Sequence, residues 1–201
     1  MFDIVTDSAC DLTPETVRQL GLTVVPFYVS TDGEHYLKEG QEIAVRDFYQ
    51  FMVDHPGTLP KTSLPSLEDF EKVFREKAAA GRETLCLCFT GKMSGGVGSA
   101  RNARELVLEN YPQAVIEVVD TAAATVSEAA TVLNAAAMRD AGCSLTETLT
   151  WLAGTRPTNQ IFFTVGNLDY LIKGGRIGKV TGLAANFLNV KIGRASCRER
   201  V

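Results

Sequence analysis

Two polar segments of this 201-residue chain have the residue types of an anion-binding loop. Asp7 and Ser8 follow one apolar run, and residues 90–96 (Thr-Gly-Lys-Met-Ser-Gly-Gly) follow another. Loops at the carboxyl ends of parallel strands meet at one sheet edge, where α/β proteins usually bind ligands. Glycines let backbone N–H groups approach a ligand, and Ser99 is predicted to start a helix whose positive end lies beside the loop. The pattern predicts an anion cradle, although the same residues suit helix caps and turns equally well.

A third polar segment, residues 61–66 (Lys-Thr-Ser-Leu-Pro-Ser), lies between two predicted helices. The hydroxyl groups of Thr62 and Ser63 can donate hydrogen bonds to a carboxylate or a phosphate. The spacing is also explained by a plain loop that leads into a helix cap at Ser66. Both interpretations remain open on the residues alone.

Familiar catalytic motifs are not matched. Residues 173–180 differ from a phosphate-binding P-loop at the first glycine and at the final hydroxyl residue. In residues 91–95 (Gly-Lys-Met-Ser-Gly), two residues precede the serine and none separates it from the second glycine, unlike the G-x-S-x-G of a serine hydrolase. His35 and His55 are the chain's two histidines, so a catalytic triad has few possible bases.

Composition excludes several classes of partner. The chain has 20 basic and 24 acidic side chains, a net charge of −4, and no basic stripe, so it is a poor candidate for binding nucleic acid. Cys86 and Cys88 lie in one predicted strand and share a face, but no second cysteine pair completes a metal site, and we expect buried thiols. No apolar run approaches the roughly 18–20 residues of a membrane span, and the N-terminus lacks signal-peptide features. A cytoplasmic protein is expected.

The order of elements predicts an α/β layered domain with a mostly parallel sheet. Strands are expected at residues 2–6, 23–29, 84–90 and 114–119, and helices at 14–20, 45–54, 66–78, 99–110, 124–140 and 145–153. A further strand at 160–165 and a helix at 168–173 indicate the start of a second α/β domain. The predicted boundaries are therefore residues 1–155 for the N-terminal domain and 156–191 for the beginning of the C-terminal domain.

The last ten residues, 192–201 (Ile-Gly-Arg-Ala-Ser-Cys-Arg-Glu-Arg-Val), are predicted not to be native. A common sequencing-adapter DNA translates into this peptide in one frame, and such tails are excluded from reasoning about a fold. We expect the native C-terminal part to be missing.

Five stretches, in order along the chain, resemble the signatures of the DegV family of bacterial fatty-acid-binding proteins. They are Ile4–Leu12, Lys61–Ser66, Met93–Gly95 with Ser99-Ala100, Val119-Asp120 and Leu168–Ile177. The resemblance implies two α/β domains that hold one long-chain fatty acid between them, and a chain truncated at its C-terminus. It also implies that some members present the fatty acid to a fatty acid kinase, without catalysis and without a cofactor.

The resemblance also implies site residues. The hydroxyl of Thr62 and the loop at Ser94 and Gly95 would hold the carboxylate, with Arg176 ordering the interdomain loop or contacting a partner protein. Ser63, Asp7, Ser8 and Ser99 are supporting candidates. Val97 departs from the family, which usually has tyrosine there, and the lost aromatic bulk is expected to reshape the acyl slot. The alternative is an enzyme using the same anion cradle, either an acyl hydrolase or a phosphotransferase.

Overall fold

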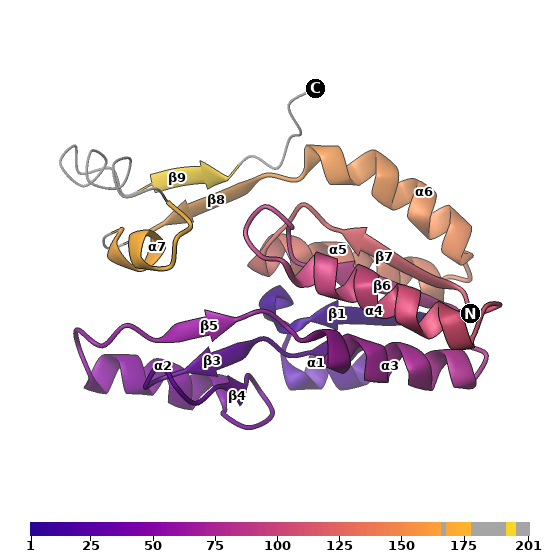
Figure 1. Cartoon of the computed structure of the whole chain (residues 1–201). Coiled ribbons are helices and arrows are strands. Elements are labelled where there is room, and N and C mark those ends of the chain that lie inside the picture. The colour runs from indigo at the N-terminus through magenta and orange to yellow at the C-terminus, as the bar shows by residue number, and fades with distance from the viewer. Residues whose placement is uncertain (166–167, 178–191, 196–201) are drawn as a thin grey trace.

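A four-stranded parallel sheet forms the centre of the computed structural model, which describes residues 1–165, 168–177 and 192–195 (Figure 1). The strand order is β2-β1-β6-β7, and every neighbouring pair is parallel. The strands are β1 (Asp3–Asp7), β2 (Thr23–Val25), β6 (Thr84–Cys88) and β7 (Ile116–Asp120). The predicted α/β layered fold with a mostly parallel sheet is confirmed.

Helices cover both faces of this sheet. Phe70 and Phe74 of α3 (Leu67–Ala79) pack with α4 (Gly96–Asn110) on one face. Val132 of α5 (Thr125–Asp140) packs with α1 (Pro14–Gln19) and α6 (Leu145–Thr155) on the other. Side chains alternate along a strand, so Cys86 and Cys88 share the α3 face, with their sulfur atoms 3.6 Å apart. The expected common face of the two buried thiols is confirmed.

The predicted single strand at residues 23–29 is wrong. Pro26, which has no N–H to donate to a sheet, follows β2, and the chain then enters β3 (Tyr28–Ser30) of a separate sheet. This sheet is antiparallel with the order β4-β3-β5, where β4 is Leu37–Lys38 and β5 is Lys61–Ser63. The polar segment after α2 (Val45–Asp54) is therefore a strand in its first half, since Thr62 pairs with Val29.

Two of the predicted helix starts are confirmed by their caps, and a third is wrong. The hydroxyl oxygens of Thr13 and Ser66 accept hydrogen bonds from the backbone N–H groups of Thr16 and Asp69. The helix predicted to start at Ser99 begins three residues earlier, at Gly96, with Gly95 as its N-cap. The Ser94 loop therefore runs directly into the first turn of α4.

The chain beyond α6 forms a small unit of its own. A short 3₁₀ helix (Arg156–Thr158) leads into β8 (Ile161–Thr164) and then α7 (Asp169–Lys173), close to the elements predicted there. β8 pairs antiparallel with β9 (Ile192–Ala195), which lies in the segment predicted to be non-native. The rest of the predicted second-domain segment, residues 178–191, lies outside the described residues. In Figure 1, α7 lies to the left of the parallel sheet, across from β5.

Candidate functional site

Two cavities that share lining residues lie between α7 and the loops of the N-terminal domain. The first, about 390 Å³, is polar and is lined by residues 62–64, 91–95 and Arg176. The second, about 650 Å³, is more apolar and is lined by Phe27, Tyr36, Leu59, Pro60, Lys61, Thr62, Phe89, Met93, Ser94, Tyr170, Leu171, Lys173, Gly174 and Arg176. Thr62, Met93, Ser94 and Arg176 line both. The pair of cavities can therefore hold one molecule with a polar end and an apolar body.

Hydrogen-bond donors converge on the polar cavity. Ser94 Oγ accepts a hydrogen bond from the Gly96 N–H at 3.2 Å, which leaves the hydroxyl proton of Ser94 available for a ligand. Within the described residues, the structure gives no intramolecular acceptor to the N–H of Gly95, the N-cap of α4. The Thr62 side chain is exposed to the same cavity from β5. These groups sit at the positive end of a 15-residue helix and suit a bound carboxylate.

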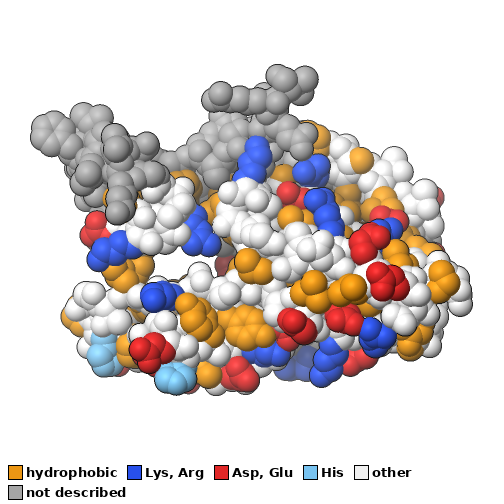
Figure 2. Space-filling view, viewed as in Figure 1, with side chains coloured by type: hydrophobic (Ala, Val, Ile, Leu, Met, Phe, Trp, Pro, Cys, Tyr) orange, Lys and Arg blue, Asp and Glu red, His pale blue; other side chains and the backbone are white. Residues whose placement is uncertain are grey.

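The two cavities are lined by basic side chains. They are Lys61, Lys92, Lys173 and Arg176, and no acidic residue accompanies them in the described parts of the chain. Arg176 Nε donates to the Met93 carbonyl at 3.4 Å, which joins the segment after α7 to the Ser94 loop. Figure 2 shows blue Lys and Arg side chains around the hollow below α7. Although the whole chain carries a charge of −4, these basic side chains create a local positive potential, which favours an anion at the site.

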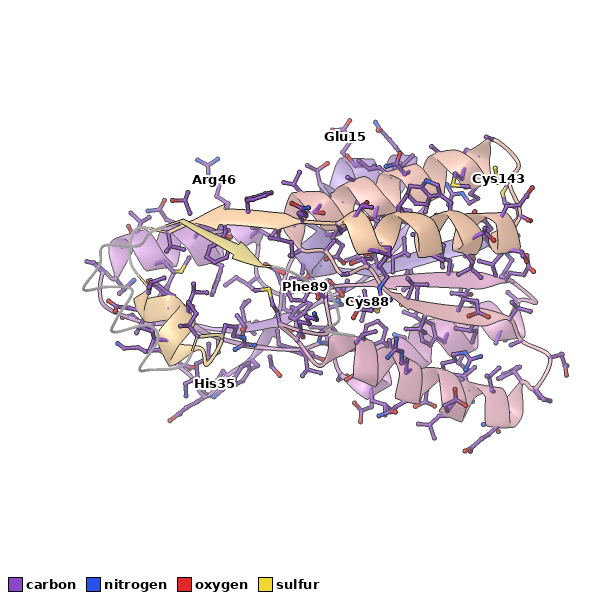
Figure 3. The ribbon with its side chains drawn as sticks, turned by 90° about the horizontal axis from the view of Figure 1, so that it is seen from above. Glu15, His35, Arg46, Cys88, Phe89 and Cys143 are labelled. Carbon is purple, nitrogen blue, oxygen red and sulfur yellow. The ribbon has the colours of Figure 1, made fainter. Side chains whose placement is uncertain are left out.

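The apolar cavity has an aromatic wall. The rings of Phe27 and Phe89 meet edge to face, with their centroids 6.0 Å apart and an interplanar angle of 78°. Figure 3 places Phe89 near the middle of the molecule, just after Cys88 at the end of β6 and on the side facing α7. Burial of apolar ligand surface against such side chains is favourable by about 25 cal/mol per Å².

Asp7 and Ser8 line neither cavity, but they hydrogen-bond to the backbone of residues that do. Both oxygens of the fully buried Asp7 carboxylate accept backbone hydrogen bonds, from Ala9 at 3.1 Å and from Phe89 at 2.8 Å. Ser8 Oγ accepts from the Phe27 N–H at 2.9 Å. These two residues, predicted to support the anion cradle, therefore hold the backbone of Phe89 and Phe27 and line neither cavity.

Of the remaining predicted residues, some line a cavity and others do not. Ser63 and Arg176 line the polar cavity, together with Thr62, Ser94 and Gly95. Ser99 lines neither cavity, because it lies inside the first turn of α4. Val97 is buried in the core cluster that contains Phe70 and Phe74, and it lines neither cavity. Its predicted effect on the acyl slot is therefore not supported by a direct contact with either cavity. In the part of the chain that the structure describes, no cluster of three or more His, Cys, Asp or Glu residues could bind a metal ion.

A buried acidic pair near the end of β1 joins the predicted Asp7 to Glu128, which the sequence predictions do not include. Glu128 of α5 is fully buried, accepts from Thr6 Oγ1 at 3.5 Å, and faces the Asp7 carboxyl. Burial, reinforced by the charge of Asp7, raises the pKa of Glu128 to about 11, so its carboxyl is protonated at neutral pH. Burial also raises the pKa of Asp7 to about 6 and that of the nearby Cys10 thiol to about 12.

Sequence reasoning also missed three residues that shape the cavities. Asp120 was recognised only as part of a motif, yet its carboxylate accepts from the Gly91 N–H and holds the Ser94 loop. Phe89 directly follows β6 and Phe27 lies two residues beyond the end of β2, a position at the ligand edge of a parallel sheet that could have identified them. Glu128 offered a comparable signal, as an acidic residue among the alanines of a predicted helix.

Comparison with known proteins places this fold in one family. The family model described as uncharacterised proteins of the DegV family matches residues 1–193. A DegV domain-containing protein of Streptococcus pyogenes serotype M1 is 36% identical over 190 residues, which are 94% of this chain and 66% of that protein. The chain thus spans slightly less than two thirds of this relative's length.

Two solved structures resemble the chain closely. A stearic-acid-binding protein from Eubacterium ventriosum has 41% identity and a TM-score of 0.88, over 98% of this chain and 71% of that one. A DegV family protein from Thermus thermophilus, described by its fatty acid binding, has 33% identity and a TM-score of 0.75, over 96% and 71% of the two chains. With a family match that extends over residues 1–193, the chain belongs to the DegV family.

Proposed function

We propose that this chain provides the carboxylate site and part of the acyl-chain cavity of a fatty-acid carrier. The observation that carries the proposal is the continuity of a polar cavity with basic lining and an apolar cavity through Thr62, Met93, Ser94 and Arg176. A long-chain fatty acid has the matching order of groups, a carboxylate followed by an apolar chain. The stearic-acid-binding relative from Eubacterium ventriosum supports the same ligand class.

Thr62, Ser94 and Gly95 are proposed to hold the carboxylate. Charge-assisted hydrogen bonds from hydroxyl and backbone N–H donors stabilise such a group by roughly 1.5–3 kcal/mol each. Arg176 lies beside both cavities and adds positive charge while its Nε remains on the Met93 carbonyl. Each buried CH₂ of the acyl chain contributes about 0.8 kcal/mol, so affinity would come mostly from the apolar cavity.

The alternative, an acyl hydrolase or phosphotransferase using the same cradle, lacks a histidine base at either cavity in the described residues. A general base must lie within hydrogen-bond reach of the nucleophile. His35 Nδ1 is 2.6 Å from the Asp32 carboxylate, and His55 Nδ1 is 3.0 Å from the Phe51 carbonyl. Neither histidine lines a cavity. Binding without turnover is therefore the function we propose, with no cofactor.

The exposed polar end suggests a use for the bound molecule. Gly91, Lys92 and Gly95 line the polar cavity and are exposed, so a carboxylate placed there would be accessible while its chain stays covered. We propose presentation of this carboxylate to a fatty acid kinase, the partner that the sequence resemblance implies. No helix of the described residues is long and apolar enough to cross a membrane.

Residues 1–155 and 156–191 are proposed to belong to the two domains that enclose the ligand. Native mass spectrometry of the protein expressed from its native gene tests the proposed function. A co-purifying fatty acid is expected in wild type and in Thr62→Ser, with clear loss in Thr62→Val, which keeps the β-branched shape of the β5 residue. Absence of lipid together with turnover of acyl esters, lost in Ser94→Ala, would overturn the carrier proposal in favour of an enzyme.

A further inference from the structure

The aromatic wall of the apolar cavity is built apart from the hydrophobic core. Phe27 and Phe89 are half-buried and belong to neither of the two core clusters among the described residues. Their edge-to-face contact, with centroids 6.0 Å apart, is made with each other at the cavity. A phenyl ring has only two side-chain torsions, so each ring is a stiff element of the cavity surface.

Adjacent residues hold the backbone of both rings. Asp7 Oδ2 accepts from the Phe89 N–H at 2.8 Å, and Ser8 Oγ accepts from the Phe27 N–H at 2.9 Å. The hydroxyl proton of Ser8 is donated to Glu39 Oε2 at 2.6 Å, which fixes the direction in which its oxygen accepts. The dipeptide Asp7-Ser8, at the end of β1, therefore holds the backbone of both rings.

Three other residues that line this cavity are more adaptable than the ring pair. Met93 has three rotatable side-chain bonds and a polarizable sulfur, and it fills irregular space readily. Lys173 and Tyr170 are exposed where they line the cavity, so they can move into solvent. A ligand of a different shape would displace these side chains more easily than the paired rings.

We propose that the Phe27–Phe89 pair selects the shape of the acyl chain, and that Asp7 and Ser8 are positioning residues for it. The inference rests on the proposed fatty-acid function and extends it to a choice between acyl chains. A straight saturated chain can lie flat against the ring pair. The bend at a cis double bond moves part of the chain toward the rings, so the wall disfavours it.

The test measures the ratio of dissociation constants for oleic acid and stearic acid, with the protein expressed from its native gene and freed of lipid. Phe27→Leu and Phe89→Leu are each expected to lower the oleic-to-stearic ratio by about fourfold or more, the factor for one buried CH₂. Ser8→Ala is expected to lower it in the same direction, because the Phe27 N–H loses its acceptor. This ratio is a readout that a general loss of stability does not move.

Two control variants match these changes away from the site. Tyr49→Leu removes an exposed ring of α2 that lines neither cavity. Thr13→Ala removes a hydroxyl that, like Ser8, accepts a backbone N–H, but at the start of α1. Both controls are expected to keep the wild-type ratio. If Ser8→Ala does not fold, Ser8→Cys keeps the shape of the side chain with a weak acceptor and takes its place.

The possible results separate this inference from the proposed function. A wild type that binds both acids, with an unchanged ratio in both leucine variants, overturns the selection by the ring pair and leaves the carrier function standing. A shift in the leucine variants without one in the Ser8 variants overturns the positioning role. A wild type that binds neither acid overturns the proposed function and this inference with it.

Discussion

The carboxylate of Asp120 accepts a hydrogen bond from the backbone N–H of Gly91 at 3.2 Å, which connects the end of β7 to the loop after β6. Its other oxygen accepts from the Ala122 N–H at 2.8 Å. A Cβ atom at Gly91 would lie 3.0 Å from the Asp120 oxygen, so the close approach requires glycine. The Ser94 loop is therefore positioned from the neighbouring strand.

Asp120→Ala is expected to weaken fatty-acid binding, because the loop that carries Ser94 and Gly95 loses its acceptor. The loss should be about tenfold, equivalent to about 1.4 kcal/mol, and is measured by titration with a fluorescent fatty acid. Asp140→Ala is the control, since Asp140 pairs with Arg139 at the end of α5 and is exposed. Equal affinity for the Asp120→Ala variant and wild type would show that the loop holds its shape without this carboxylate.

Thr62→Val should reduce affinity for a fatty acid by roughly tenfold to a hundredfold, the range for one charge-assisted hydrogen bond of about 1.5–3 kcal/mol. Valine keeps the β-branched side chain that pairs opposite Val29, so β5 should remain intact. Calorimetric titration of wild type, Thr62→Val and Thr62→Ser measures the effect. Serine should restore most of the affinity, and equal loss in both variants would point to packing and not to the hydroxyl.

Stability is expected to fall as pH rises because of Glu128. Burial, then the nearby Asp7 charge, raises the pKa of Glu128 to about 11, whereas an unfolded glutamate has a pKa of about 4.3. Between these values the folded protein binds more protons than the unfolded chain, so the free energy of unfolding decreases with pH. Asp7, whose pKa burial raises to about 6, adds the same trend below that pH.

Glu128→Gln removes this titration and should raise the free energy of unfolding by about 2 kcal/mol at about pH 8, with little effect at about pH 4. Urea unfolding at both pH values measures the difference. Glu147→Gln provides the opposite sign, because hydrogen bonds from Ser144 lower the pKa of Glu147 and its contribution is lost in acid. A pH-independent effect of Glu128→Gln would contradict a protonated Glu128 in the folded state.

Thr125 is strained at the start of α5, where its φ is 49°. A β-branched residue rarely adopts this left-handed conformation, which costs roughly 1–2 kcal/mol for residues with a Cβ atom. Thr125→Gly is therefore expected to raise the melting temperature, with a net gain of about 0.5–1 kcal/mol after the entropy of glycine is included. Thr150→Gly, at an exposed position inside α6, should lower it by a similar amount. Equal melting temperatures for Thr125→Gly and wild type would rule out this strain.

Local patterns in the sequence were sufficient for the fold class and for much of the lining of the polar cavity. Apolar runs between helical patterns predicted β1, β6 and β7, and the hydroxyl residues Thr13 and Ser66 cap helices. Each of these features depends on neighbours only a few residues away. The five short family signatures identified Thr62 and Ser94, which line both cavities.

Tertiary structure decided what these residues contact. Pro26 divides the predicted strand 23–29, and only the resulting antiparallel sheet makes a strand of Lys61–Ser63 and brings Thr62 to the Ser94 loop. Asp7 and Ser8 have the residue types of an anion site, yet their oxygens are used by the N–H groups of Phe89 and Phe27. Donors separated by many residues compete for the same acceptor, and the outcome depends on which segments the packed core places side by side. Residue type and spacing therefore specify the chemistry available at this sheet edge, and long-range packing determines which groups remain free for a ligand.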